Sequence, residues 1–225
     1  MGSDNKLISH AFFNQSNQDD PRWQPMLDLY SAVRMGCNKW IEGEVKQSKV
    51  VSVVEKFNLK YGVSLSDRDK LYRYNNGMAF STLVTYPQSL QGQAGSVRWF
   101  LLISGGHLPR AAITELWLDC SGKKNNRFIS IDIFELKKIK AHRNSRYVWS
   151  WEINKVEFKK IKEKITDFIA KGEKENCERE LNNIIVMRSY AGVQQQLKVL
   201  EEFVQLELEK NGNGLTLSVD WQDAD

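Results

Sequence analysis

The sequence predicts an α+β fold, in which an antiparallel meander of about five strands is flanked by two N-terminal and three C-terminal helices. Three observations support this prediction. Apolar residues recur at helical spacing over residues 21–60 and 154–210, whereas they alternate with polar residues between 78 and 153. Turn signals, not helices, separate the predicted strands, which favours antiparallel pairing. With 225 residues, of which 41% are hydrophobic and 27% charged, the chain is long enough to bury a core.

The N-terminal part of the chain predicts two helices after a polar segment, residues 1–20, that we expect to be a flexible arm. Asp20 and Pro21 suit the cap and the first position of a helix. Apolar residues at helical spacing predict that this helix continues to about Glu42. A second helix is expected over residues 45–60, because apolar residues line one side of it and a glycine follows it.

The central part of the chain predicts five strands, and the part that follows predicts three helices. The strands are expected at residues 78–86, 97–103, 113–120, 128–136 and 146–153. A capping box of Asn154 and Glu157 opens the first helix, which is expected to break at Gly172. The other helices are expected at residues 174–187 and 193–210. We therefore expect a single domain over residues 21–210 and an acidic tail over residues 211–225.

Cysteine content, hydropathy and motifs argue against several classes of protein. Three widely spaced cysteines cannot form a complete set of internal disulfides, and no Cys or His pattern predicts zinc, so we expect a cytoplasmic protein without metal or other cofactor. No apolar run is long enough for a membrane helix, and the start lacks the pattern of a signal peptide. No phosphate-binding glycine loop or nucleophile motif is present, so the sequence predicts a protein that is not an enzyme.

Positive charge is concentrated in residues 123–164, which contain thirteen Lys and Arg against five Asp and Glu in a chain of net charge +4. One group lies in a segment expected to connect two strands, and a second recurs along one outer face of the next helix. Such a surface suits the phosphate backbone of DNA, although an ordinary solvated face explains the pattern equally well. The predicted phosphate-binding residues are Lys137, Lys138, Lys140, Arg143 and Arg146 in the connection and Lys155, Lys159 and Lys162 in the helix.

Aromatic residues accompany this charge. Tyr147, Trp149 and Trp151 alternate along the predicted strand 146–153 and so share one of its faces. They can be core residues beneath the helices or a platform for unstacked bases. The core is the favoured interpretation, because the following helix needs an apolar surface to cover.

Four segments occur in an order that is typical of one family. A Trp149–Trp151 strand follows a basic turn, and Arg188–Gln196 opens the last helix. Leu108–Arg110 and Leu116–Cys120 fit the same pattern. Over about residues 77–205 the chain thus resembles the MobI-type mobilisation proteins of conjugative plasmids and integrating conjugative elements. The resemblance implies an accessory factor of transfer-origin processing, without nuclease chemistry of its own.

These observations predict a non-enzymatic, DNA-binding accessory protein of a mobile genetic element, with partners in a DNA-processing complex. A protein–protein adaptor is the alternative, because the acidic end could pair with the basic stretch of another copy, dock a basic partner, or fold back on its own basic patch. A metal-dependent nuclease ranks last. It would need carboxylates such as Asp132 and Glu135 to gather around magnesium, and these two face opposite sides of the predicted strand.

Overall fold

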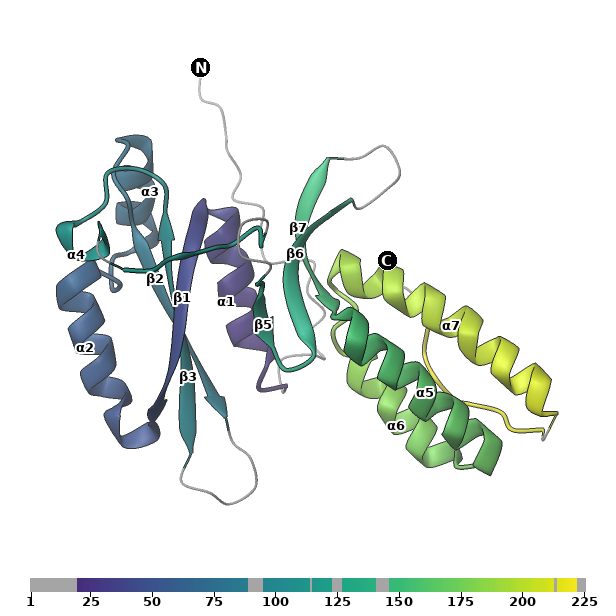
Figure 1. Cartoon of the computed structure of the whole chain (residues 1–225). Coiled ribbons are helices and arrows are strands. Elements are labelled where there is room, and N and C mark those ends of the chain that lie inside the picture. The colour runs from purple at the N-terminus through teal and green to yellow at the C-terminus, as the bar shows by residue number, and fades with distance from the viewer. Residues whose placement is uncertain are drawn as a thin grey trace. The chain divides into compact units, whose positions relative to one another are not determined.

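The computed structural model describes residues 20–88, 95–113, 115–122, 127–140, 146–212 and 214–221 (Figure 1). The chain forms two compact units. The N-terminal unit comprises Gln24–Ile131 and Leu136–Lys138, and the C-terminal unit comprises Asp132–Glu135 and Ile139–Asp225 together with the start of the chain up to Trp23. Helices and antiparallel sheets occur together, which confirms the predicted α+β class. Apart from Asp20, the predicted arm lies outside the described residues. That residues 21–210 fold as one domain stays a prediction.

The N-terminal unit is built on a four-stranded antiparallel sheet in the order β2-β3-β1-β4. Its strands are β1 (Cys37–Lys46), β2 (Ser81–Gln88), β3 (Ser96–Ser104) and the short β4 (Leu118–Asp119). A 3-10 turn, Gln47–Lys49, joins β1 to the helix that follows it. The helices are α1 (Trp23–Arg34), α2 (Val50–Tyr61), α3 (Asp67–Asn75) and the single turn α4 (Arg110–Ile113).

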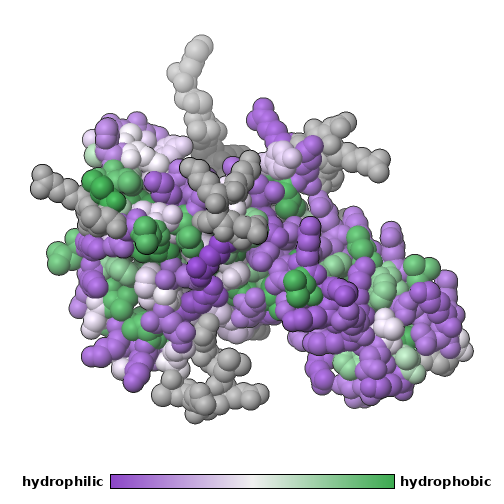
Figure 2. Space-filling view, viewed as in Figure 1, coloured by the Kyte–Doolittle hydropathy of each residue, from purple (hydrophilic) through white to green (hydrophobic). Residues whose placement is uncertain are grey.

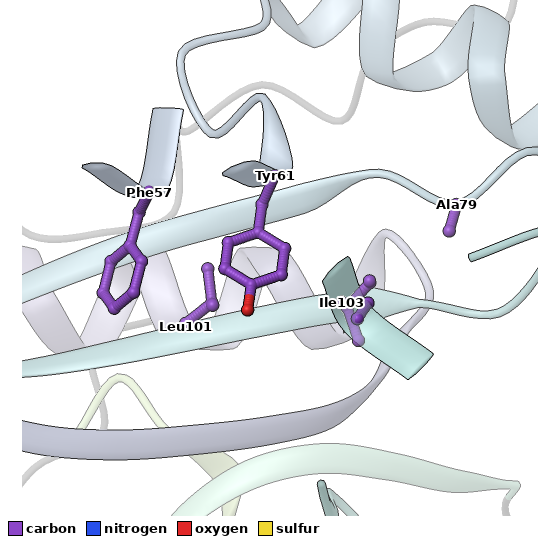
Figure 3. Close-up of a cluster of buried hydrophobic side chains, with 6 residues drawn as sticks. Phe57, Tyr61, Ala79, Leu101 and Ile103 are labelled. Atoms are coloured by element: carbon purple, nitrogen blue, oxygen red, sulfur yellow. The ribbon is translucent and has the colours of Figure 1, made fainter. Parts of the chain in front are cut away.

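Alternation of side chains along the strands gives this sheet two apolar faces. Phe57 and Tyr61 of α2 cover one face, where they form a buried cluster with Leu101 of β3 (Figure 3). Trp40 of β1 and Phe100 of β3 are fully buried on the other face, with their ring centroids 6.3 Å apart. Helices α1 and α2 lie on opposite sides of the sheet (Figure 1). The sheet is thus the core of the N-terminal unit.

The helix predicted to continue to Glu42 ends earlier, because the chain turns at Gly36. This glycine has a φ of 107°, in the left-handed region that glycine adopts without steric cost. Beyond it, Cys37–Lys46 is strand β1 instead of helix and pairs with β3 along nearly its whole length. The second predicted helix consequently starts later, at Val50, and ends at Gly62 as expected.

The predicted five-strand meander is wrong in its connections. The described residues contain seven strands in two sheets, and β1 is inserted between β3 and β4. The strand predicted at 113–120 is reduced to β4, since α4 and irregular chain precede it. The strand predicted at 128–136 is divided into β5 (Ile129–Ile131) and β6 (Phe134–Lys140) by a turn at Asp132, which has a φ of 49°.

Other elements agree with the sequence pattern. Strand β3 confirms the prediction at 97–103, and β7 (Tyr147–Ile153) confirms the prediction at 146–153. The strand predicted at 78–86 forms as β2, a few residues later. Helix α3 is not predicted, because none of its residues is buried and apolar periodicity is therefore missing from it.

In the C-terminal unit, three helices follow β7, as predicted (Figure 1). They are α5 (Lys155–Lys171), α6 (Lys174–Ile185) and α7 (Ala191–Asn211). The side chain of Asn154 caps α5 by accepting a hydrogen bond from the backbone N–H of Glu157 at 2.9 Å, and the left-handed Gly172 ends it. Strands β6 and β7 form a hairpin in a three-stranded sheet of order β5-β6-β7, whose residues are divided between the two units.

Helix α7 lies directly on the backbone of β7. The N–H of Gly192 donates to Oγ of Ser150 at 2.9 Å, and the side-chain amide of Gln196 bonds both the N–H and the C=O of Ile153 at 2.7 Å. A Cβ atom on Gly192 would overlap the carbonyl oxygen of Trp151, so only glycine allows this approach. These contacts fix the inner half of β7 against the helices.

The end of the described chain, residues 214–221, has no regular secondary structure and is attached to the helices by polar contacts. The backbone N–H of Ser218 donates to the carboxylate of Glu178 on α6 at 2.6 Å. Asp220 pairs with Arg188, which follows α6, at 3.3 Å. The acidic tail thus folds back on its own unit.

Candidate nucleic-acid interface

The outer half of the β6–β7 hairpin is exposed on both faces. At its inner half Phe134 and Trp151 are fully buried, whereas Lys140, Tyr147 and Val148 in its outer half are exposed. Tyr147 and Val148 are neighbours in one strand, so their side chains point to opposite faces, and they expose 65% and 39% of their surface. Lys140, Tyr147 and Val148 therefore lie outside the apolar core of the C-terminal unit.

The sequence of this hairpin segment carries positive charge without any acidic residue. Residues 136–151 contain five Lys or Arg and no Asp or Glu. Lys140 ends β6 and Arg146 precedes β7, and both are exposed. The predicted residue Arg143 lies between them, in residues 141–145, outside the described part of the chain. We refer to Lys140, Arg146, Tyr147 and Val148 as the hairpin end.

The hairpin end has a defined local geometry. Nζ of Lys140 lies 5.5 Å from the centroid of the Tyr147 ring, which is a cation–π distance. The carbonyl oxygen of Lys140 accepts a hydrogen bond at 3.0 Å from the side-chain amide of Gln195 on α7. Helix α7 thus holds the backbone of β6 through Gln195 and that of β7 through Gln196, while the side chains of the hairpin end stay exposed.

The predicted connection between the two strands is in part strand itself. Lys137, Lys138 and Lys140 all belong to β6, so their side chains alternate between its faces. Lys138 is exposed, whereas Lys137 is half-buried, with Nζ 4.6 Å from the centroid of the Phe128 ring. Lys137 and Lys138 belong to the N-terminal unit, and Lys140 and Arg146 belong to the C-terminal unit.

The three lysines predicted on α5 have different surroundings, although the surface over this helix is hydrophilic (Figure 2). Lys155 is exposed in the first turn. Lys159 exposes 81% of its side chain and pairs with Glu163 at 3.4 Å. Lys162 is half-buried, and its Nζ lies 5.1 Å and 4.8 Å from the ring centroids of two phenylalanines, one on α5 and one on α7. Lys155 and Lys159 can reach a ligand, whereas Lys162 contributes to helix packing.

The structure places the predicted residues of the C-terminal unit in two groups. Arg146 and Asn154 flank β7 at its two ends, and a strand rises about 3.3 Å per residue, which puts their Cα atoms roughly 26 Å apart. Lys140 and Arg146 therefore lie at one end of β7, and Lys155 with the rest of α5 follows the other end. The two groups do not form one continuous patch.

Carboxylates that could serve a metal site are engaged with other side chains. Glu115 accepts hydrogen bonds at 2.7 Å from Lys60 and Tyr61, and these bonds hold the pKa of Glu115 below its ordinary value. Asp132 lies 4.0 Å from the guanidinium of Arg22. Within the described ranges, no three His, Cys, Asp or Glu side chains gather as a metal site would require.

The cysteines offer no activated thiol. Cys37, Cys120 and Cys177 are all buried and free of disulfides. Burial raises the pKa of Cys177 to about 11 and that of Cys37 to about 12, so the nucleophilic thiolate is scarce at neutral pH.

A cavity of about 260 Å³ lies between the end of α6, helix α7 and the tail. Arg188 and Lys198 bring positive charge to its wall, and Glu201 and Asp220 bring negative charge. Two of these wall residues, Asp220 and Arg188, form an ion pair at 3.3 Å. Because the charges balance, the wall does not select a ligand of either sign.

No described helix is both long and apolar enough to cross a membrane. No protein-family model, no curated protein and no solved structure matches this chain. The function must therefore be inferred from the chemistry of its own residues.

Sequence reasoning identifies Lys140 and Arg146 but not their exposed apolar neighbours. The alternation favours a core position for Tyr147, Trp149 and Trp151, whereas Trp151 is fully buried, Trp149 is half-buried and Tyr147 is exposed. The signal that could have distinguished them is the run of charge in residues 137–146. Residues 137–146 are so polar that few apolar side chains are available to cover the start of β7.

Proposed function

We propose that this protein binds nucleic acid without catalysing a reaction on it, and that the hairpin end makes the main contact. The observation that carries the proposal is the exposed hairpin end, which lies in a segment, residues 136–151, that contains five Lys or Arg and no Asp or Glu. Lys140 ends β6 and Arg146 directly precedes β7, and α7 holds the backbones of both strands. Such a hairpin can place positive charge beside consecutive phosphates of a polyanion.

The placement of charge supports a phosphate backbone as the ligand. Each phosphate that a cation neutralises releases condensed counterions, so several cations close together give affinity that one alone does not. Lys140 and Arg146 have no Asp or Glu within four residues along the chain. Lys159 on α5, in contrast, already pairs with Glu163, which weakens its attraction for a phosphate. We therefore assign α5 a secondary contact.

We expect affinity for nucleic acid to fall steeply with salt. The two described cations of the hairpin end, Lys140 and Arg146, would give a log–log slope of about −2 on duplex DNA, or about a tenfold loss between roughly 50 and 200 mM salt. Fluorescence anisotropy of a labelled random oligonucleotide over that range measures the slope. Absence of binding at the lowest salt, or an affinity that does not change with salt, would contradict the proposal.

The biological target that we propose is DNA at the transfer origin of a conjugative element. This part of the proposal rests on the resemblance of residues 77–205 to MobI-type mobilisation proteins. An oligonucleotide from a transfer origin, compared at equal salt with a random one of the same length, tests it. Equal affinities for the two would leave phosphate binding intact and remove the specific target.

A protein–protein adaptor is the second candidate, and exposed apolar side chains of the N-terminal unit favour it. Leu59 of α2 and Leu116 each expose 93% of their surface, and Ile113 exposes 67%. Leu59 and Leu116 adjoin the two members of the Lys60–Glu115 ion pair along the chain, so they lie in one region. Figure 2 shows hydrophobic residues at the surface of this unit. Apolar surface of this kind often marks a protein contact.

Light scattering tests whether this apolar region joins two copies of the chain. If it does, the wild type has twice the chain mass of 26.0 kDa, and Leu59→Ser combined with Leu116→Ser returns it to the mass of one chain. The double variant keeps its affinity for nucleic acid, because neither leucine belongs to the hairpin end. A wild type that has the mass of one chain would rule out self-association through these residues.

A further inference from the structure

The aromatic row on β7 changes from core to surface along the strand. Trp151 is fully buried, Trp149 is half-buried and Tyr147 exposes 65% of its surface, although all three share one face. Trp151 contributes to the core of its unit. Tyr147 is too exposed for that role, so packing does not account for an aromatic side chain at its position.

The surroundings of Tyr147 combine a flat ring with positive charge. Nζ of Lys140 lies 5.5 Å from the ring centroid, and Arg146 is the preceding residue. Every nucleotide likewise joins a flat base to a negative phosphate. A ring with a lysine ammonium over it is therefore complementary to a nucleotide with an accessible base face, in shape and in charge.

The strand that carries Tyr147 is held in place before any ligand arrives. Oγ of Ser150 accepts the N–H of Gly192, and Gln196 bonds both backbone groups of Ile153. These bonds hold the inner half of the strand, so the strand itself does not have to be ordered when a base stacks on Tyr147.

We propose that the hairpin end binds single-stranded nucleic acid, with one unpaired base stacked on Tyr147 and adjacent phosphates held by Lys140 and Arg146. The inference rests on the proposed function and specifies the form of nucleic acid. In a duplex both faces of a base are covered by its neighbours, so a surface ring finds no base face to stack on. Phosphate contacts alone would not need the tyrosine.

The test is anisotropy with three labelled probes of equal length: a single strand, a duplex, and a single strand without bases. Tyr147→Ala is expected to weaken binding of the normal single strand by about 5- to 150-fold, the range for loss of one stacked base. It should leave the other two probes unchanged, because they are bound through phosphates. Tyr147→Phe, which keeps the ring, should retain the wild-type affinity.

The outcomes separate this inference from the proposed function. If Tyr147→Ala binds the normal single strand as tightly as the wild type, or weakens all three probes equally, stacking is overturned and phosphate binding stands. If the wild type binds none of the probes at low salt, the proposed function fails. Because Tyr147 is exposed, the variant should keep the wild-type melting temperature, so a loss of affinity cannot be attributed to unfolding.

Discussion

Gly192→Ala is expected to destabilise the protein by about 2–4 kcal/mol, because the added methyl group meets backbone instead of a movable side chain. Its Cβ would overlap the carbonyl oxygen of Trp151 and lie 3.2 Å from Cβ of Glu152. Helix α7 would have to move away from β7, which also breaks the buried hydrogen bond from Gly192 to Ser150. In a chain of 225 residues this corresponds to a fall in Tm of roughly 10 °C.

The direction of the stability change in Gly192→Ala distinguishes close packing of α7 on β7 from its absence. Alanine is a better helix former than glycine by about 1 kcal/mol, so without the close approach to β7 the substitution would stabilise α7. Gly95→Ala is the matched control, because a Cβ there meets nothing within 4 Å, and its stability should stay within about 0.5 kcal/mol of the wild type. Thermal unfolding of both variants measures the difference. A Gly192→Ala protein as stable as the control would show that α7 does not pack on β7 as described.

The sequence predicts those helices and strands whose local residue pattern fits only one type of secondary structure. Helix α5 has a capping asparagine, a stripe of buried isoleucines and a terminal glycine, and its bounds follow from these features. Strand β3 ends in five consecutive buried residues, Phe100–Ser104, and lies in the interior of its sheet. In both elements, local preference and burial require the same structure.

The misassigned segment, Cys37–Lys46, satisfies two patterns at once. Cys37 and Trp40 continue the helical spacing of α1, whereas the adjacent apolar residues Trp40 and Ile41 also suit a strand that is covered on both faces. A long-range contact determines the outcome, because β1 pairs with β3, whose paired residues are fifty or more positions away. Only Gly36 marks the boundary locally, and a single glycine does not distinguish a helix end from a tolerated interruption.

The candidate site was predictable in its charges but not in its exposure. A run of lysine and arginine is visible in the sequence, whereas the neighbour of each side chain depends on packing. Lys137 lies over the ring of Phe128, and Lys162 lies between α5 and α7, so neither position is equivalent to Lys140. The separation of Arg146 from α5 follows from the length of β7, which sets the two groups at opposite ends of a strand.

Reversing the charge of Lys140 and Arg146 should reduce affinity for nucleic acid by at least about a hundredfold, since each charge-assisted contact contributes about 1.5–3 kcal/mol. The double variant Lys140→Glu with Arg146→Glu should also flatten the salt slope by about 1 for each phosphate that is no longer neutralised. Both side chains are exposed and outside the core, so the fold should persist, which circular dichroism can verify.

Two further double variants show whether position or net charge decides the outcome. Lys46→Glu with Lys49→Glu changes the net charge by the same amount at exposed lysines of the N-terminal unit, and should cost less than about threefold in affinity. Lys155→Glu with Lys159→Glu tests α5 and should cost less than about tenfold, since Lys159 already pairs with Glu163.

The most direct measurement is the anisotropy titration of one labelled single strand with these three double variants at equal, low salt. We predict that the hairpin variant binds about a hundredfold or more weakly than the wild type, that the α5 variant is affected far less, and that the Lys46–Lys49 variant is almost unaffected. Equal reductions in all three would mean that net charge alone attracts the ligand. Full affinity in the hairpin variant would contradict the assignment of the hairpin end.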